Sequence, residues 1–229
     1  MNWERFRRAE TAYWAAGVFF LLLLAASIYS DIRLPSATPQ PEEMPEELTA
    51  IEEGYRSSGD HVEAGRLARE YIEREPKVAA AYRLLAEISY IQGDIIVAAE
   101  NMEIAAALDP ENDDFAFFKS DIYRQIGWFD QGIDVMTVLL DRDPNNVDAL
   151  LQRADMYLSS GRPQQGLNDL SYALVVSEDK KAEILFRRAH FFASVGQFED
   201  AAVDLEEIPA TGDQQWIEAA ENLKAQIGL

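Results

Sequence analysis

Hydrophobic and polar positions follow a helical period along most of this chain, but the first part of the chain is different. From Thr11 to Ser30 the sequence reads TAYWAAGVFFLLLLAASIYS, without a single formal charge. As a helix rising ~1.5 Å per residue, such a segment spans roughly 30 Å, the thickness of a bilayer's hydrocarbon core. The pattern predicts one transmembrane helix over residues 11–30. The alternative is a cleaved signal peptide, because Ala25, Ala26 and Ser27 are small.

The residues on either side of this span predict its orientation and a stalk. Arg5, Arg7 and Arg8 precede it, whereas Arg33 is the only base close behind it. The positive-inside rule then places residues 1–10 in the cytoplasm and the remainder outside, which in a bacterium is the periplasm. Residues 31–44 are acidic and rich in proline, which favours an extended stalk. An irregular linker is the plainer interpretation of the same stretch.

After residue 44 the apolar pattern repeats with a period of about 34 residues. Glycines stand at positions 59, 93, 127, 161 and 196, and five residues after each comes Ala or Gly. Proline follows the first three of these glycines by seventeen positions. Between these turn signals, apolar residues recur at helical intervals, so each unit is expected to form two antiparallel helices.

These repeats resemble the tetratricopeptide repeat (TPR) family over residues 45–208, as five units. The signature positions are best seen in the unit 79–112, as Tyr82, Leu85, Ala86, Gly93, Ala98, Ala105 and Pro110. Two residues depart from the pattern: Glu52 stands at a small position and Lys119 at an apolar one. The resemblance implies an all-α fold, an α-solenoid of about five TPR helix pairs preceded by the transmembrane helix.

A solenoid needs a cap at its end, since each repeat buries its apolar face only against a neighbour. Within residues 209–229, Trp216, Ala220, Leu223 and Ile227 fall on one side of a helix that follows Thr211, Gly212 and Asp213. We therefore predict a C-terminal capping helix over residues 213–227.

Charge and composition exclude several functions. The chain has 41 Asp and Glu against 20 Lys and Arg, a net charge of −21, and all but three of the acids follow residue 33. Such a domain repels nucleic acid, whose binding needs Lys and Arg to replace counterions. With no cysteine, the chain has neither disulfides nor thiolate chemistry.

Little in the sequence points to catalysis. The two histidines, His61 and His190, lie in different repeats, and the HExxH, GxSxG and phosphate-binding glycine motifs are missing. The acidic run 109–114 offers oxygen ligands but lacks the alternation and turn glycine of an EF-hand loop. We predict no enzyme activity, no cofactor and no metal; an enzyme with unrecognised catalytic residues is the least favoured reading.

A partner-binding groove is the main functional prediction. The resemblance implies that the first helix of each repeat lines the concave face. In this sequence, acids stand at ninth and second positions of these helices, with apolar residues between them. These candidate residues are Glu53, Glu87, Asp121 and Asp155 as a ladder, Asp114 and Asp148 beside it, and Tyr90, Phe117, Phe118 and Phe186 as apolar ground. The groove would suit a basic and partly apolar protein segment, although a merely solvated face would read the same way. Trp128, beside the turn of the third repeat, is a second candidate surface.

Two classes of function fit these features. The first is a membrane-anchored scaffold or assembly factor, similar in plan to the envelope TPR proteins of cytochrome c maturation. The second is a permanent accessory subunit of a membrane complex, with Ala12 and Ala16 as a small-residue contact face.

Overall fold

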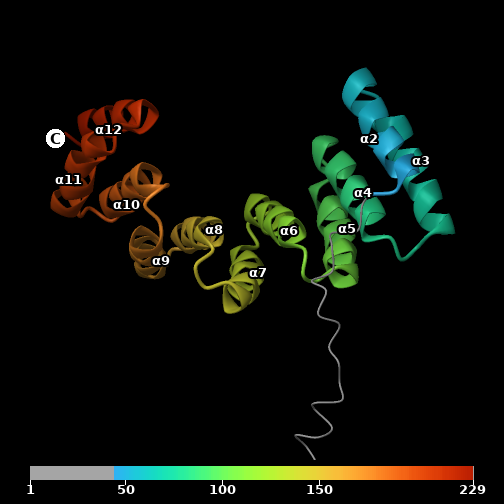
Figure 1. Ribbon diagram of the computed structural model, residues 1–229, viewed down its shortest axis with the longest axis horizontal. Coiled ribbons are helices and arrows are strands. Elements are labelled where there is room, and N and C mark those ends of the chain that lie inside the picture. Colours follow the sequence, from blue (N-terminus) through green and yellow to red (C-terminus); the bar gives the residue numbers. More distant parts are fainter. Residues whose placement is uncertain (1–43, 229) are drawn as a thin grey trace, which may run out of the picture. The chain divides into compact units, whose positions relative to one another are not determined.

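The computed structural model describes residues 44–228, and these fold entirely into helices joined by short turns (Figure 1). The described part contains eleven α-helices and one 3₁₀ helix. Their bounds are α2 Glu46–Ser58, α3 His61–Arg74, α4 Ala79–Ile91, α5 Ile95–Leu108, α6 Asp113–Gln125, α7 Phe129–Arg142, α8 Val147–Ser159, α9 Pro163–Val176, α10 Lys181–Ser194, α11 Phe198–Glu207, η1 Ile208–Thr211 and α12 Gln214–Ile227.

Residues 1–43 lie outside the described residues. They include the predicted cytoplasmic segment 1–10, the predicted transmembrane helix 11–30 and all but the last residue of the predicted stalk 31–44. Among the helices between residues 44 and 228, none is long and apolar enough to cross a bilayer.

The five repeat glycines end the first helix of each pair, as predicted. All five take a positive φ between 73° and 85°, the left-handed region in which a Cβ is strained. The prolines lie at the end of the second helix of a pair. Helix α5, for example, ends with Asp109 as its C-cap, and Pro110 follows. A residue that precedes proline is disfavoured in the helical region, so the helix stops there. The side chain of Asn112 then accepts a hydrogen bond from the backbone N–H of Phe115 and starts α6.

The core consists of clusters shared between neighbouring repeats. Leu48, Ile51 and Tyr55 of the first pair pack with Leu84 and Ile88 of the second. A second cluster joins the second and third pairs, and a third joins the third pair to the fourth and to Phe191 of the fifth. Each pair therefore buries its apolar face against the next one, as expected for a solenoid.

Small residues let the helices of each pair approach closely. Ala64, Ala98 and Ala201 are buried at the fifth position after the turn glycine. The corresponding positions in the third and fourth repeats are glycines. A Cβ on Gly132 would lie 2.3 Å from Sδ of Met156, and one on Gly166 would lie 2.4 Å from Cε1 of Phe191. These two repeats are therefore packed more tightly than an alanine allows.

Two ion pairs, each with a buried aspartate, occupy equivalent places in the last two repeats. Arg153 of α8 donates two hydrogen bonds to Asp169 of α9, both 2.8 Å long. Arg188 of α10 does the same to Asp204 of α11, at 2.8 and 2.6 Å. Such bidentate pairs fix the orientation of the two helices, and removing the arginine would leave the aspartate buried and unpaired.

The two departures from the repeat pattern are accommodated by nearby charges and rings. Glu52 is buried at its small position and accepts hydrogen bonds from Arg56 at 2.7 Å and Arg83 at 3.2 Å. Lys119 places its ammonium 5.5 Å from the ring centre of Tyr123, a cation–π distance.

The capping helix forms where it was predicted. Asp213 is the N-cap of α12, and its carboxylate accepts a hydrogen bond from the backbone N–H of Gln215. Ala220 and Leu223 are buried against α10, α11 and η1, with Trp216 and Ile227 packed beside them. The apolar core of the last repeat is thereby covered by the cap.

Candidate functional site

The first helices of the third, fourth and fifth repeats enclose a groove of about 750 Å³. Its lining comes from α6, α8 and α10: Asp114, Phe117, Phe118, Asp121, Arg124, Asp148, Leu151, Gln152, Asp155, Glu183 and Arg187. Six of the ten predicted groove residues thus line one hollow: Asp114, Phe117, Phe118, Asp121, Asp148 and Asp155. The ladder acids Asp121 and Asp155 occupy the same position in successive repeats, which is why they meet.

Three of the other predicted residues, Glu53, Glu87 and Phe186, lie elsewhere, so the ladder is not one continuous feature. Glu53 is exposed on α2, and the acid of that repeat that faces its neighbour is Glu52, one position earlier. Glu87 belongs to a separate polar cluster between α2 and α4. Phe186 packs against Trp216 of the capping helix, with ring centres 5.2 Å apart, and does not line the groove.

Glu87 is held by three side chains. Tyr55 donates a hydrogen bond to it at 2.5 Å, Arg83 at 2.8 Å and Arg56 at 3.3 Å. Burial, and then the hydrogen bond to Glu87, raise the pKa of Tyr55. This cluster joins the first two repeats and leaves Glu87 little freedom to bind a ligand.

Arginines of the same chain also pair with the ladder acids in the groove. Arg124 lies 3.0 Å from Asp121 within α6. Arg187 of α10 reaches Asp155 of α8 at 2.6 Å and Glu183 at 2.8 Å. These arginines offset part of the negative charge of the groove, and the pair between Arg187 and Asp155 joins residues of two adjacent repeats.

The groove nevertheless keeps an excess of negative charge, with five carboxylates against two guanidinium groups. Asp114 has no ion-pair partner among the described residues, and Asp148 pairs with Lys180, itself outside the lining. Burial raises the pKa of Asp155, against the opposing effects of Arg187 and Arg124. The negative charge open to a ligand is therefore greatest at Asp114 and Asp148, both in the first turn of their helices.

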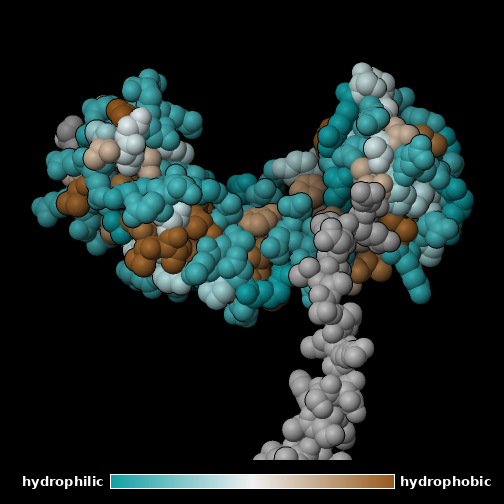
Figure 2. All heavy atoms as spheres, in the orientation of Figure 1, coloured by the Kyte–Doolittle hydropathy of each residue, from teal (hydrophilic) through white to brown (hydrophobic). Residues whose placement is uncertain are grey.

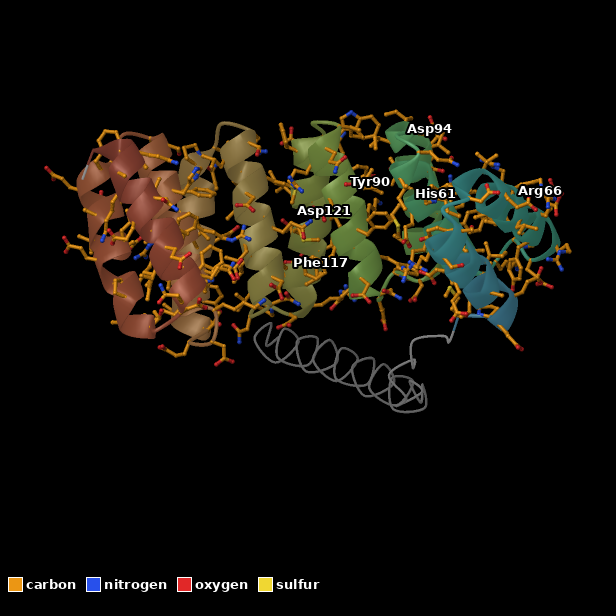
Figure 3. All side chains as sticks on the ribbon, turned by 90° about the horizontal axis from the view of Figure 1, so that it is seen from above. His61, Arg66, Tyr90, Asp94, Phe117 and Asp121 are labelled. Carbon is orange, nitrogen blue, oxygen red and sulfur yellow. The ribbon has the colours of Figure 1, made fainter. Side chains whose placement is uncertain are left out.

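An aromatic strip extends the groove toward the second repeat. The rings of Tyr90 and Phe118 meet edge to face with centres 5.8 Å apart, and the side chain of Gln125 donates a hydrogen bond to the Tyr90 hydroxyl. Figure 3 shows Tyr90, Phe117 and Asp121 on the neighbouring helices α4 and α6. Gln152 donates to the backbone oxygen of Phe117 at 3.2 Å, which ties the floor of the groove to α8.

Some groove residues were not foreseen from the sequence. Arg124, Gln152 and Arg187 line the groove but were not among the candidates. The spacing of Asp121 and Arg124, three apart on one helix, was a usable signal, because such residues are neighbours on the helix surface. The pair of Arg187 with Asp155 joins two repeats, and only the packing reveals it.

Trp128 is 41% exposed and lies outside the lining of the groove. Its ring packs on Tyr123 with centres 5.8 Å apart, and its backbone N–H donates to the carbonyl of Tyr123 at 2.8 Å. The acidic run 109–114 forms the turn between α5 and α6. Within residues 44–228, no three His, Asp or Glu side chains are arranged to hold a metal ion.

Comparisons with known proteins support the fold. No protein-family model matches the sequence, and no curated protein does. Among solved structures, MamA (41-end) from Desulfovibrio magneticus RS-1 is similar with a TM-score of 0.63 and 14% identity, over 75% of this chain and 98% of that one. YrrB, described as a TPR protein with an unusual peptide-binding site, is similar with a TM-score of 0.59 and 15% identity, over 78% of this chain and 98% of that one. The helical part of this chain thus has the fold of a TPR solenoid.

Proposed function

We propose that this protein is a non-enzymatic TPR scaffold that binds a protein segment in the groove formed by α6, α8 and α10. The observation that carries the proposal is the groove itself: an apolar floor of Phe117, Phe118 and Leu151 beneath an acidic rim. Concave surfaces are where repeat proteins usually bind their partners. YrrB, which has a similar fold, is described as having a peptide-binding site.

The charges and rings favour a basic and partly apolar segment. A ligand cation can approach Asp114 without displacing an ion-pair partner among the described residues. At Asp148 it has to compete with Lys180, but that ion pair is exposed, and exposed pairs contribute only ~0–1 kcal/mol. An apolar ligand side chain would cover Phe117 and Phe118, both partly buried. The ligand would thus gain electrostatic attraction at the rim and hydrophobic contact at the floor.

The apolar run 11–30 would anchor this scaffold in the membrane, with residues 1–10 in the cytoplasm and the TPR domain in the periplasm or an equivalent outside compartment. Under this proposal the protein holds its partner beside the membrane, as an assembly factor for an envelope complex such as the machinery of cytochrome c maturation. Extraction in mild detergent separates this role from that of a permanent subunit, which would remain stoichiometric with its complex.

Synthetic peptides test the groove directly. A twelve-residue peptide alternating Lys and Leu and its Glu–Leu counterpart would be titrated against the full chain by fluorescence anisotropy. We expect the Lys–Leu peptide to bind more tightly. Asp114→Lys with Asp148→Lys should weaken its binding by about tenfold or more, since like charges across an interface are costly. Phe118→Ala should remove the part of the affinity that survives high salt.

The matched control places the same two charge reversals outside the groove. Asp130→Lys and Glu199→Lys also lie in the first turns of their helices, so they change the net charge and the helix-dipole interaction equally. If this control weakens binding as much as the groove variant does, the peptide is attracted only by the overall negative charge, and the proposed site is wrong.

A further inference from the structure

The outer face of α9 differs from the other outer helices of the solenoid in carrying no exposed charge. Its exposed residues are Gln164, Gln165, Asn168, Ser171, Tyr172 and Val175. The one charged residue of α9, Asp169, is buried and paired with Arg153. In a chain with a net charge of −21, an uncharged helix face of this length is a distinct surface.

The second helices of the neighbouring repeats, α7 and α11, show the contrast. On α7 the exposed residues include Asp130, Asp134 and Asp141, and on α11 four of the six exposed residues are Asp or Glu. Helix α5 exposes more apolar side chains, but its outer face also carries Glu100 and Glu103. A neutral surface on α9 is thus bordered by acidic ones.

This neutral face also has apolar character. Val175 is 81% exposed and Tyr172 is 42% exposed. The Tyr172 hydroxyl donates a 2.8 Å hydrogen bond to Oδ1 of Asn145, which holds the ring in place on the surface. Figure 2 shows hydrophobic residues gathered where α9 lies in Figure 1. A held aromatic ring beside an exposed valine is suited to contact with another protein.

The chemistry of this face is complementary to itself. Gln, Asn, Ser and Tyr side chains each donate and accept hydrogen bonds, so the face can pair with a second copy of itself, whereas a carboxylate face cannot. Two chains of strongly negative charge repel one another wherever their acidic surfaces meet. We infer that α9 is the self-association surface of this protein, through which two copies meet in a two-fold symmetric dimer.

The surroundings of α9 would set the register of such a dimer. A two-fold contact brings the same patch of each copy together, so a residue near the middle of α9 meets its own counterpart. If one copy were displaced sideways across α9, exposed acids of α7 or α11 would approach acids of the other copy, at an electrostatic cost. One helix face of ~21 Å length makes a small interface, in the class of weak and transient contacts.

The chain has no cysteine, which makes single-cysteine reporters specific. Under mild oxidation of the full chain in detergent, Ser171→Cys should form a disulfide-linked dimer. Ile104→Cys on α5 and Val138→Cys on α7, which are also exposed on outer helices, should not. Comparable cross-linking of all three variants, or none at Ser171, would overturn the inference.

Sedimentation velocity gives an independent test without cross-links. The wild-type chain should show a concentration-dependent dimer whose population rises with NaCl, because salt shortens the Debye length from ~10 Å at 0.1 M to ~3 Å at 1 M and screens the repulsion between copies. Asn168→Asp with Val175→Glu should raise the dimer Kd about tenfold or more. Gln131→Glu with Val203→Glu adds the same charge on α7 and α11 and should not.

The sedimentation results of the wild type and of the two double variants decide between the outcomes. If the wild type remains monomeric throughout, or if both double variants weaken the dimer equally, α9 is not its interface. Circular dichroism of each variant checks that the helices remain intact, which is expected since all four substituted positions are exposed.

Discussion

At the scale of single residues, the third and fourth repeats depend on two glycines that no turn requires. Gly132 and Gly166 lie inside helices, where glycine is otherwise unfavourable. Their role is steric, because Met156 and Phe191 pack directly onto their backbones. Glu52 shows the opposite case, in which a large side chain fits a small position because Arg56 and Arg83 pair with it.

Alanine at these glycines tests this interpretation. A Cβ on Gly166 would lie 2.4 Å from Phe191 and 2.9 Å from the backbone oxygen of Ala154, so Gly166→Ala should lower the free energy of unfolding by ~1–3 kcal/mol. Gly54 of α2 is the matched control, since nothing lies within 4 Å of its Cβ position. Gly54→Ala should stabilise by ~0.4–1 kcal/mol. Urea unfolding measures both, and equal effects would contradict the packing.

At the scale of elements, each helix pair is stable only with a neighbour on its open side. The last pair, α10 and α11, meets η1 and α12 in place of another repeat. Helix α12 uses Ala220 and Leu223 at a spacing of three, which puts both on the buried side. This helix therefore contributes more to stability than its position at the end of the chain suggests.

Truncating one buried side chain of the cap measures that contribution. Leu223 is 6% exposed, and Leu223→Ala should lower the free energy of unfolding by ~2–5 kcal/mol through lost burial and a new cavity. Val138→Ala, at a site 61% exposed on α7, should change it by no more than ~0.5 kcal/mol. Identical urea midpoints for the two variants would show that α12 does not cap the solenoid.

At the scale of the whole molecule, negative charge has opposite consequences on two surfaces. The groove of α6, α8 and α10 uses it to attract a basic segment, so binding there should weaken as salt rises. The neutral face of α9 is where that charge is missing, so self-association there should strengthen with salt. Raising the salt concentration should therefore weaken peptide binding in the groove and strengthen self-association through α9.

Membrane topology is tested on the whole chain in cells. A reporter that is active only outside the cytoplasm, fused after Leu229, should be active, because Arg5, Arg7 and Arg8 hold the N-terminus inside. Intact mass spectrometry should find the N-terminal residues, including Trp3, still attached. A mature chain that begins at Ile28 would instead identify residues 11–30 as part of a cleaved signal, and an inactive reporter would contradict the orientation.

The sequence by itself determined the helices, the turns and the cap. Gly93 and Gly127 were identifiable because only glycine is unstrained in the left-handed turn, and Leu223 because its apolar spacing is helical. Such signals are local, so each repeat displays them within its own 34 residues. The meeting of Asp121 with Asp155 in one groove followed from the period alone.

Only the tertiary structure decided which charges remain available and which faces stay open. Arg187 neutralises Asp155 from the next repeat, and Phe186 is covered by Trp216 of the cap. Both contacts join residues about thirty positions apart, and their geometry depends on how two helices cross. The neutrality of α9 likewise emerges only when Asp169 is seen to be buried against Arg153. A charge counts at a surface only if packing leaves it exposed and unpaired, and the composition of the chain does not contain that information.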